Sequence, residues 1–137
     1  MKIFMAYSHT DRDYAASLAT EIERQGVAVI NPEMSLAPGD EWSTALRDMI
    51  ESAGAAVLVL PRGGASGANN AIFEAGAAKA LGKQVFVVAR GSTDRELPTD
   101  IADLAILSAE TKSVDEVAET LVRQTGWGVQ QQVRLMS

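Results

Sequence analysis

Short apolar runs alternate along the chain with amphipathic stretches. Five runs predict buried strands, at residues 2–7, 27–30, 55–60, 83–88 and 105–107. Amphipathic or small-residue stretches predict helices at residues 10–25, 40–54, 69–82 and 113–126, with a short helical turn at residues 100–104. Strands that alternate with helices in this way predict a parallel sheet with helices on both of its faces.

Glycine and short polar residues mark the ends of these elements. Gly26 and Gly82 stand where a glycine closes a helix in the left-handed conformation. Thr10 or Asp11 can cap the first helix. The sequence from Ser113 to Glu116 has the spacing of a capping box, so the last helix is expected to begin at Ser113.

One acidic residue interrupts the small-residue stretch ASGANNAIFEAGAAKALG, residues 65–82. This residue, Glu74, is expected in the first or second turn of a helix that begins near Asn69 or Asn70. The alanines and Gly76 behind it allow the helix to press closely on a sheet. In a β-α-β unit such a helix opens at the carboxyl end of the strands, where α/β sheets bind ligands. Glu74 is therefore a candidate for chemistry, and complementing the helix dipole is the alternative.

Composition removes several classes of function. The chain has 137 residues, no cysteine and one histidine, His9, so thiol chemistry and multi-histidine metal sites are excluded and we expect no metal. A net charge of −6 argues against nucleic acid as a partner. The apolar run at 53–60 is too short to cross a membrane, and the first residues do not resemble a signal peptide, so we expect a cytoplasmic protein. We expect one domain, residues 1–137, with a tail at 127–137 that has no clear period.

Familiar signatures of other α/β enzymes are missing. The turn after the first strand lacks the glycine-rich dinucleotide motif, and no GKS or GKT phosphate loop follows any strand. The third strand ends in Leu60-Pro61-Arg62, where a phosphoacceptor domain needs an aspartate. A nucleophile elbow is also absent. Hydride transfer, triphosphate hydrolysis, phosphorelay and acyl transfer are thereby disfavoured.

Three segments in order resemble Toll/interleukin-1 receptor (TIR) domains. They are FMAYSHTDRDYAASLATEIERQGVAV, LAPGDEWSTALRDMI, and AAVLVLPRG with the Glu74 helix and GKQVFVV, which together cover about residues 2–90. The resemblance implies a flavodoxin-like three-layer sandwich with a five-stranded parallel sheet in the order 2-1-3-4-5. It also implies an NAD+ nucleosidase or cyclase that uses NAD+ as substrate and no cofactor, in bacterial immune or stress signalling. Glu74 matches the catalytic glutamate of enzymatic members.

The resemblance and the positions of the loops nominate residues that bind the substrate. Tyr7, Ser8 and His9 stand at the end of the first strand. The alternatives are that Ser8 only turns the chain and that His9 is an exposed loop residue. The full set of substrate-binding candidates is Tyr7, Ser8, His9, Asn31, Asp40, Trp42, Arg62 and Asn70. Trp42 is alternatively a core anchor, and Arg62 a solvated arginine. Enzymatic TIR domains carry tryptophan and cysteine where this chain has Asn70 and Ala71.

Two alternatives remain open at this point. The run NNAIFEAGAAKALGKQV also resembles nucleoside 2-deoxyribosyltransferases, whose nucleophilic glutamate would again be Glu74. A non-catalytic TIR scaffold is the other alternative, favoured by Asn70 in place of the tryptophan. TIR domains of either kind act as assemblies, so the resemblance implies self-association and an activating partner or domain.

Overall fold

The fold is described from a computed structural model, which describes residues 2–31, 42–62, 69–91 and 105–125. The strands are β1 (Lys2–Ala6), β2 (Ala28–Ile30), β3 (Ala55–Leu60), β4 (Gln84–Ala89) and β5 (Ala105–Ser108). The helices are the 3₁₀ turn η1 (His9–Asp11), α1 (Arg12–Arg24), α3 (Trp42–Ser52), α4 (Asn69–Ala80) and α5 (Val114–Gln124). The helical turn expected at 100–104 and the tail at 127–137 lie outside the described residues.

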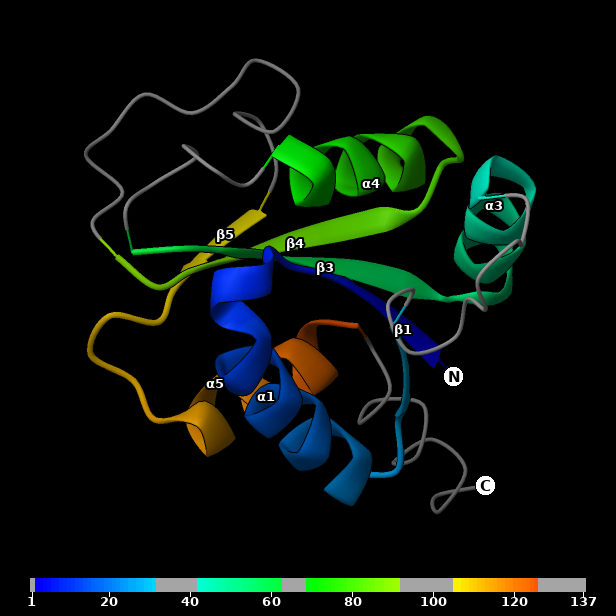
Figure 1. Ribbon diagram of the computed structural model, residues 1–137. Helices are drawn as coiled ribbons and strands as arrows, with labels where there is room; N and C mark the ends of the chain where they lie inside the picture. The colour runs from blue at the N-terminus through cyan, green and yellow to red at the C-terminus, as the bar shows by residue number, and fades with distance from the viewer. Residues whose placement is uncertain (1, 32–41, 63–68, 92–104, 126–137) are drawn as a thin grey trace, which may run out of the picture.

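The five strands form one parallel sheet, as the sequence pattern predicted, in the order β2-β1-β3-β4-β5 that the family resemblance implied (Figure 1). β3 and β4 pair along their whole length, from Ala55 opposite Gln84 to Leu60 opposite Ala89. All six residues of β3 are buried. A parallel strand is buried on both faces when helices cover the sheet on both sides, which explains its uninterrupted apolar sequence.

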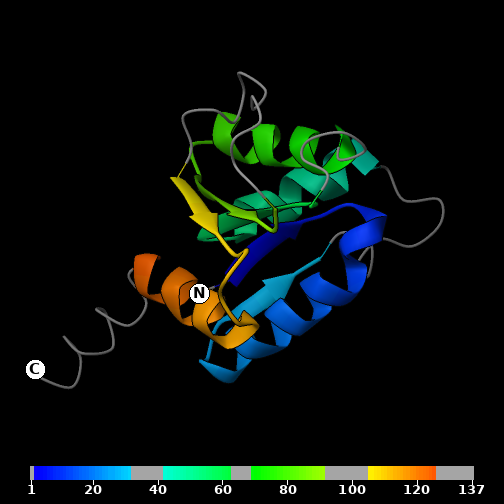
Figure 2. The same ribbon diagram turned by 90° about the vertical axis from the view of Figure 1, so that its left-hand side faces the viewer.

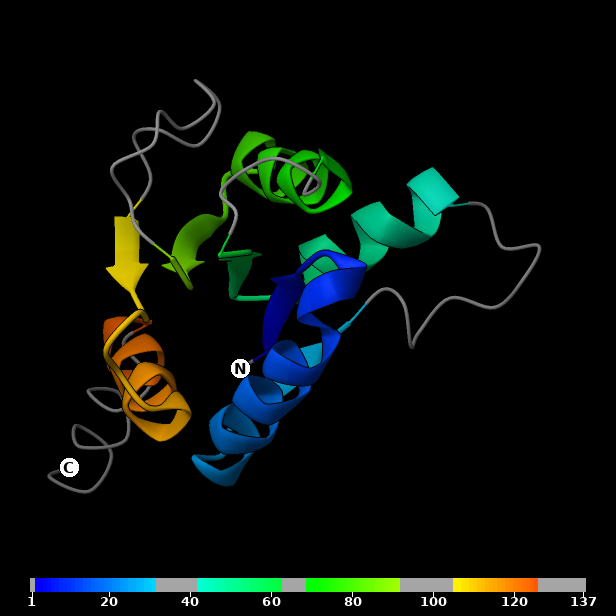
Figure 3. The same ribbon diagram turned by 60° about the vertical axis from the view of Figure 1, so that its left-hand side comes forward.

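Helices α1 and α5 cover one face of the sheet, and α3 and α4 cover the other (Figures 1 and 2). Successive residues of a strand point to opposite faces, so β1 contributes to two cores. Ile3 and Met5 pack in the core under α1 and α5. Phe4 and Ala6 pack in the core under α3 and α4. Figure 3 shows the same three layers from a third direction.

The structure confirms only some of the helix-end features that the sequence predicts. Gly26 and Gly82 have φ angles of 90° and 78°, as expected of glycines that close helices. Ser113 is the N-cap of α5, but its side chain makes no capping hydrogen bond, so the capping box is wrong in that detail. The Ser113 hydroxyl bonds to Asp115 instead, and this bond is the main cause that lowers the pKa of the Asp115 carboxyl. Asp11 likewise occupies the N-cap of α1 without capping it.

Gly91 allows the chain to leave β4 close to the chain that leaves β3. A Cβ at residue 91 would lie 2.6 Å from the carbonyl oxygen of Arg62 and 3.0 Å from its Cα. Both obstructing atoms belong to the backbone, which cannot rotate away as a side chain can. Glycine is therefore required where β3 and β4 end.

Substitution of Gly91 by alanine is expected to lower the free energy of unfolding by about 1–3 kcal/mol because the new methyl group overpacks the junction. Gly76→Ala is the matched control, because a Cβ at Gly76 meets nothing within 4 Å and alanine favours the helix by about 0.5–1 kcal/mol. Urea unfolding of both variants measures the difference. Equal stabilities for the two variants would contradict this account of Gly91.

Candidate functional site

Several of the predicted site residues lie at the carboxyl edge, which we define as the described chain segments that follow strands β1 to β4. Tyr7 and Ser8 follow β1, Asn31 follows β2, Arg62 comes shortly after β3, and Arg90 follows β4. Because the strands are parallel, these residues leave the sheet on the same side. The fold therefore places residues far apart in sequence at one edge.

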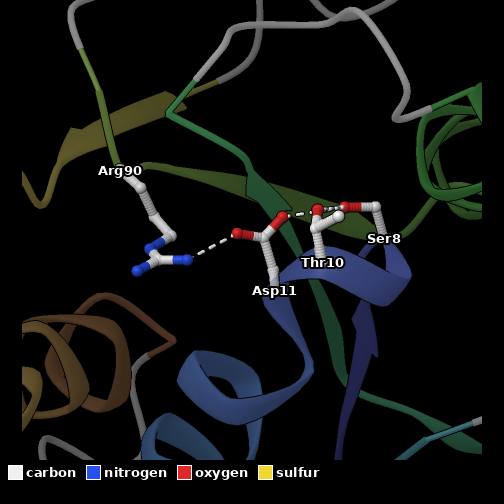
Figure 4. Close-up of polar contacts among 4 residues, drawn as sticks. All are labelled: Ser8, Thr10, Asp11 and Arg90. Carbon is white, nitrogen blue, oxygen red and sulfur yellow. Dashed lines mark hydrogen bonds and ion pairs between the residues drawn. The ribbon is translucent and has the colours of Figure 1, made fainter.

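A network of polar contacts joins the end of β1 to the end of β4 (Figure 4). The Ser8 hydroxyl donates to Oδ2 of Asp11 at 2.8 Å. Nη1 of Arg90 donates to Oδ1 of the same carboxylate at 2.6 Å. The Ser8 and Thr10 hydroxyl oxygens lie 3.0 Å apart. Asp11 is only 2% exposed, so the structure holds a buried carboxylate with a guanidinium on one oxygen and a hydroxyl on the other.

Arg90 is held from a second side by Tyr14. The guanidinium carbon lies 4.4 Å from the centre of the Tyr14 ring, within the range of a cation–π contact. The Tyr14 hydroxyl is buried and has no hydrogen-bond partner among the described residues. Burial raises the pKa of Tyr14, the charge of Arg90 opposes this rise, and the charge of Asp11 adds to it. Ring and carboxylate together fix the guanidinium.

Replacing Tyr14 by phenylalanine is expected to leave stability at pH 7 unchanged or raise it by up to about 1 kcal/mol, because an unpaired buried hydroxyl is removed. The raised pKa of Tyr14 adds a pH dependence. The unfolded chain ionises this tyrosine from about pH 10, so folded wild type loses stability as pH rises from there through the higher folded pKa. Urea unfolding at pH 7 and above pH 10 should show a smaller alkaline loss in the variant.

Tyr7→Phe is the matched control at pH 7, because Asn31 donates to the Tyr7 hydroxyl. Loss of this hydrogen bond is expected to lower the free energy of unfolding by about 0.5–1.5 kcal/mol. Destabilisation of Tyr14→Phe as large as that of Tyr7→Phe would contradict an unpaired Tyr14 hydroxyl.

Tyr7 and Asn31 are two predicted residues that the fold brings together. Nδ2 of Asn31 donates to the hydroxyl oxygen of Tyr7, which joins the chain after β2 to the chain after β1. Both side chains are part-buried. The contact holds the chain at Asn31, and the segment 32–41 that follows lies outside the described residues.

His9 lies on the exposed side of the turn. Nη2 of Arg12 contacts Nδ1 of His9 at 2.8 Å. A guanidinium can only donate, so Nδ1 accepts and a neutral His9 carries its proton on Nε2.

Glu74 is buried in the second turn of α4, as the sequence predicted for its position. It is 8% exposed, and it and Asp11 are the two buried charged residues among those the structure describes. α4 packs on β1, β3 and β4. Ala71 and Ala75 share a hydrophobic cluster with Ala6, which stands two residues before Ser8. The small residues therefore let the helix lie directly over the end of β1, with a carboxylate among its buried residues.

The remaining predicted residues are placed only in part. Arg62 is exposed just after β3. Asp40 lies outside the described residues. Trp42 begins α3 and Asn70 lies in the first turn of α4, but the structure describes only their backbone. Their roles in binding stay predictions.

Sequence reasoning missed Asp11 and Arg90 as residues of this edge. Asp11 was considered only as a helix cap, and Arg90 was assigned no role. Both stand within a few residues of a strand's carboxyl end, where α/β sheets bind ligands, and this position was the available signal. No sequence pattern indicated that Asp11 and Arg90 form a pair. They stand 79 residues apart, and β3 separates β1 from β4 in the sheet.

Comparison with protein-family models gives a match to the TIR domain over residues 3–122. The chain belongs to the TIR domain family. A search of curated proteins gives no match.

Solved structures show that this TIR domain shares its fold with proteins of several activities. The TIR domain of the Toll-related receptor TRR-2 from Hydra magnipapillata is 18% identical with a TM-score of 0.64, over 90% of this chain and 96% of that one. A 2-deoxyribosyltransferase from Bacillus psychrosaccharolyticus is 17% identical with a TM-score of 0.62, over 86% and 90%. The CMP N-glycosidase BcmB of Clostridium botulinum is 14% identical with a TM-score of 0.58, over 88% and 98%. At these identities the likeness concerns the fold alone.

The described part of this TIR domain contains neither a candidate metal cluster nor a candidate membrane span. Its described residues contain no group of three or more histidine, aspartate or glutamate residues that could hold a metal ion. None of its described helices combines the length and apolar character that crossing a bilayer requires.

Proposed function

We propose that this TIR domain is an NAD+ nucleosidase or cyclase that cleaves the bond between nicotinamide and ribose. The observation that carries the proposal is the buried carboxylate of Glu74 on a helix that opens at the carboxyl edge. The other buried carboxylate, Asp11, is engaged by Ser8 and Arg90 in holding that edge together. Glu74 is the better candidate for chemistry because it is the residue that matches the catalytic glutamate of enzymatic TIR domains.

One carboxylate is enough for this reaction. Nicotinamide is already cationic in NAD+ and leaves as a neutral molecule, so no acid has to protonate it. The bond breaks through a transition state that resembles an oxocarbenium ion, as in other glycosidic cleavages. A buried carboxylate stabilises the positive charge that develops on the ribose, and its effect is larger in a site that excludes water. Water or a second group of the substrate then takes the place of nicotinamide, which gives linear or cyclic ADP-ribose.

The other roles in the proposal belong to the carboxyl edge. In the proposal Ser8, Tyr7 and Asn31 contact the ribose, and the exposed Arg62 binds the diphosphate. Asp40, Trp42 and Asn70 complete the set that the family resemblance suggests. The proposal includes self-association through TIR–TIR contacts, an activating partner, a cytoplasmic location and a role in bacterial defence or stress signalling.

Transfer of a deoxyribosyl group is the second candidate. Two observations favour it: the run Phe73-Glu74-Ala75-Gly76 within the sequence that resembles deoxyribosyltransferases, and the fold shared with the 2-deoxyribosyltransferase from Bacillus psychrosaccharolyticus. A non-catalytic scaffold is the third candidate, since Asn70 replaces the family tryptophan.

The test that separates these candidates offers purified protein two substrate sets. One is NAD+, and the other is a 2′-deoxynucleoside with a free base. Products are resolved by chromatography with mass detection, over a series of protein concentrations. Nicotinamide with ADP-ribose or its cyclic form supports the proposal, and base exchange without loss of NAD+ supports the transferase. If neither set reacts at any concentration, the scaffold is favoured.

Self-association is expected to accompany NAD+ cleavage. Light scattering across the same concentration series should show assemblies larger than one chain where specific activity is highest. Full specific activity from a strictly monomeric species would contradict the proposed dependence on assembly.

A further inference from the structure

The hydrogen bonds around Ser8 determine which way its proton points. A serine hydroxyl has one proton to donate and two lone pairs that accept. The Ser8 proton is directed at Oδ2 of Asp11, 2.8 Å away, and a carboxylate can only accept. Because that proton is committed, the 3.0 Å contact with Thr10 must be a bond that Thr10 donates. One lone pair of the Ser8 oxygen is then left for another donor.

Asp11 is held so that this arrangement does not reverse. Its other carboxylate oxygen receives Nη1 of Arg90 at 2.6 Å, and its side chain is 2% exposed. Arg90 is held in turn by the Tyr14 ring and by its own backbone, whose N–H donates to the carbonyl of Leu60 at 3.1 Å. The orientation of the Ser8 hydroxyl therefore depends on strands β3 and β4 as well as on its own turn.

We propose that Asp11 and Arg90 are positioning residues that make Ser8 a pure hydrogen-bond acceptor toward the substrate. Such an acceptor selects a ligand with a donor at that point, and the donors of a nucleotide sugar are its ribose hydroxyls. This inference rests on the proposed function, because it assigns Ser8 to the ribose of the nucleotide that Glu74 is proposed to cleave. It predicts that this site distinguishes a ribose hydroxyl from a group of similar size that cannot donate.

Exchange of Asp11 for asparagine should reverse the hydroxyl. Arg90 can only donate, so the asparagine turns its oxygen toward Arg90 and its NH₂ toward Ser8. The Ser8 oxygen then accepts from the NH₂, and its proton is released toward the ligand. Asp13→Asn is the matched control, because Asp13 is exposed on α1 two residues away and its exchange makes the same change of charge.

The test measures dissociation constants by calorimetry in proteins that all carry Glu74→Gln, so that cleavage of NAD+ is slowed by about 100-fold or more during the measurement. The ligands are NAD+ and two analogues in which the 2′ or the 3′ hydroxyl of the nicotinamide ribose is replaced by fluorine. With Ser8 and Asp11 intact, and equally with Asp13→Asn, fluorine at one position should weaken binding about 3- to 10-fold. Asp11→Asn and Ser8→Ala should each bring the ratio of the two dissociation constants, fluorinated analogue over NAD+, to near one. A structural role of Asp11 alone would weaken all three ligands alike.

Ser8→Ala leaves the ion pair intact, so the inference is testable even if Asp11→Asn does not fold. A fluorine penalty that persists in Ser8→Ala overturns the inference. If the protein with Glu74 intact nevertheless cleaves NAD+, the proposed function stands without it. A penalty that depends on Ser8, in a protein that never cleaves NAD+, supports the assignment of Ser8 and overturns the proposed function. Failure to bind any of the three ligands, together with no cleavage of NAD+ by the protein with Glu74 intact, overturns both.

Discussion

Replacement of Glu74 by glutamine is expected to lower kcat for NAD+ cleavage by about 100-fold or more. Glutamine keeps the size of the side chain and removes the negative charge that would stabilise the oxocarbenium-like transition state. A loss of 100-fold corresponds to about 2.7 kcal/mol of barrier, within the range seen when one preorganised electrostatic group is removed. KM should change less than kcat, because the charge develops mainly in the transition state. Initial rates of nicotinamide release at several NAD+ concentrations measure both constants.

Glu51→Gln is the matched control for this variant. Glu51 is an exposed glutamate at the end of α3, paired with Arg47, and the exchange makes the same chemical change away from the buried helix face. Its kcat should stay within about 2-fold of wild type, since exposed ion pairs contribute little. Circular dichroism and thermal unfolding establish that both variants are folded. A Glu74→Gln protein that is folded and retains most of its kcat would show that Glu74 does not carry the reaction.

Replacement of Arg90 by methionine is expected to lower the free energy of unfolding by about 3–5 kcal/mol. The variant keeps a long side chain over Tyr14 but leaves the buried Asp11 carboxylate without its counter-charge. Because Arg90 itself is 21% exposed and Ser8 still donates to Asp11, we expect the lower part of that range. The melting temperature should fall by about 10 °C for a domain of this size. Urea and thermal unfolding at pH 7 measure both quantities.

Two further proteins test whether the loss comes from the uncompensated charge. The double variant Asp11→Asn/Arg90→Met removes both charges and should recover part of the stability lost in Arg90→Met. Arg47→Met breaks the exposed ion pair with Glu51 and should cost less than about 1 kcal/mol. If Arg90→Met costs no more than Arg47→Met, the ion pair between Asp11 and Arg90 does not hold the carboxyl edge together.

Much of the fold could be predicted from sequence because local patterns determine it. The run AAVLVL is apolar throughout because β3 is the central strand with helices on both faces. Gly26 and Gly82 mark the ends of helices because their φ angles are positive, which other residues rarely adopt. The position of Glu74 in the first or second turn of its helix followed from Asn69 and Asn70 as candidate helix starts.

The polar contacts were harder to predict because each depends on what the fold brings within reach. Asp11 and Ser113 both stand at helix N-caps, yet neither side chain caps its helix. Ser113 bonds to Asp115, and Asp11 is taken by Ser8 and by Arg90, which arrives from a strand two places away in the sheet. The helix-capping preferences of these residues correctly predicted where the helices begin. The partners of their side chains depend instead on which residues the fold brings close. The contact between Tyr7 and Asn31 belongs to the same class.

The central claim is that this TIR domain cleaves the bond between nicotinamide and ribose with Glu74. The measurement that tests it most directly is a single-turnover time course, with folded protein in excess over NAD+ and both products identified by mass. The account predicts release of one nicotinamide for each NAD+ consumed, with an equal amount of linear or cyclic ADP-ribose, and a rate at least about 100-fold lower in Glu74→Gln. NAD+ that stays intact with the protein in excess, or equal rates for wild type and variant, would contradict it.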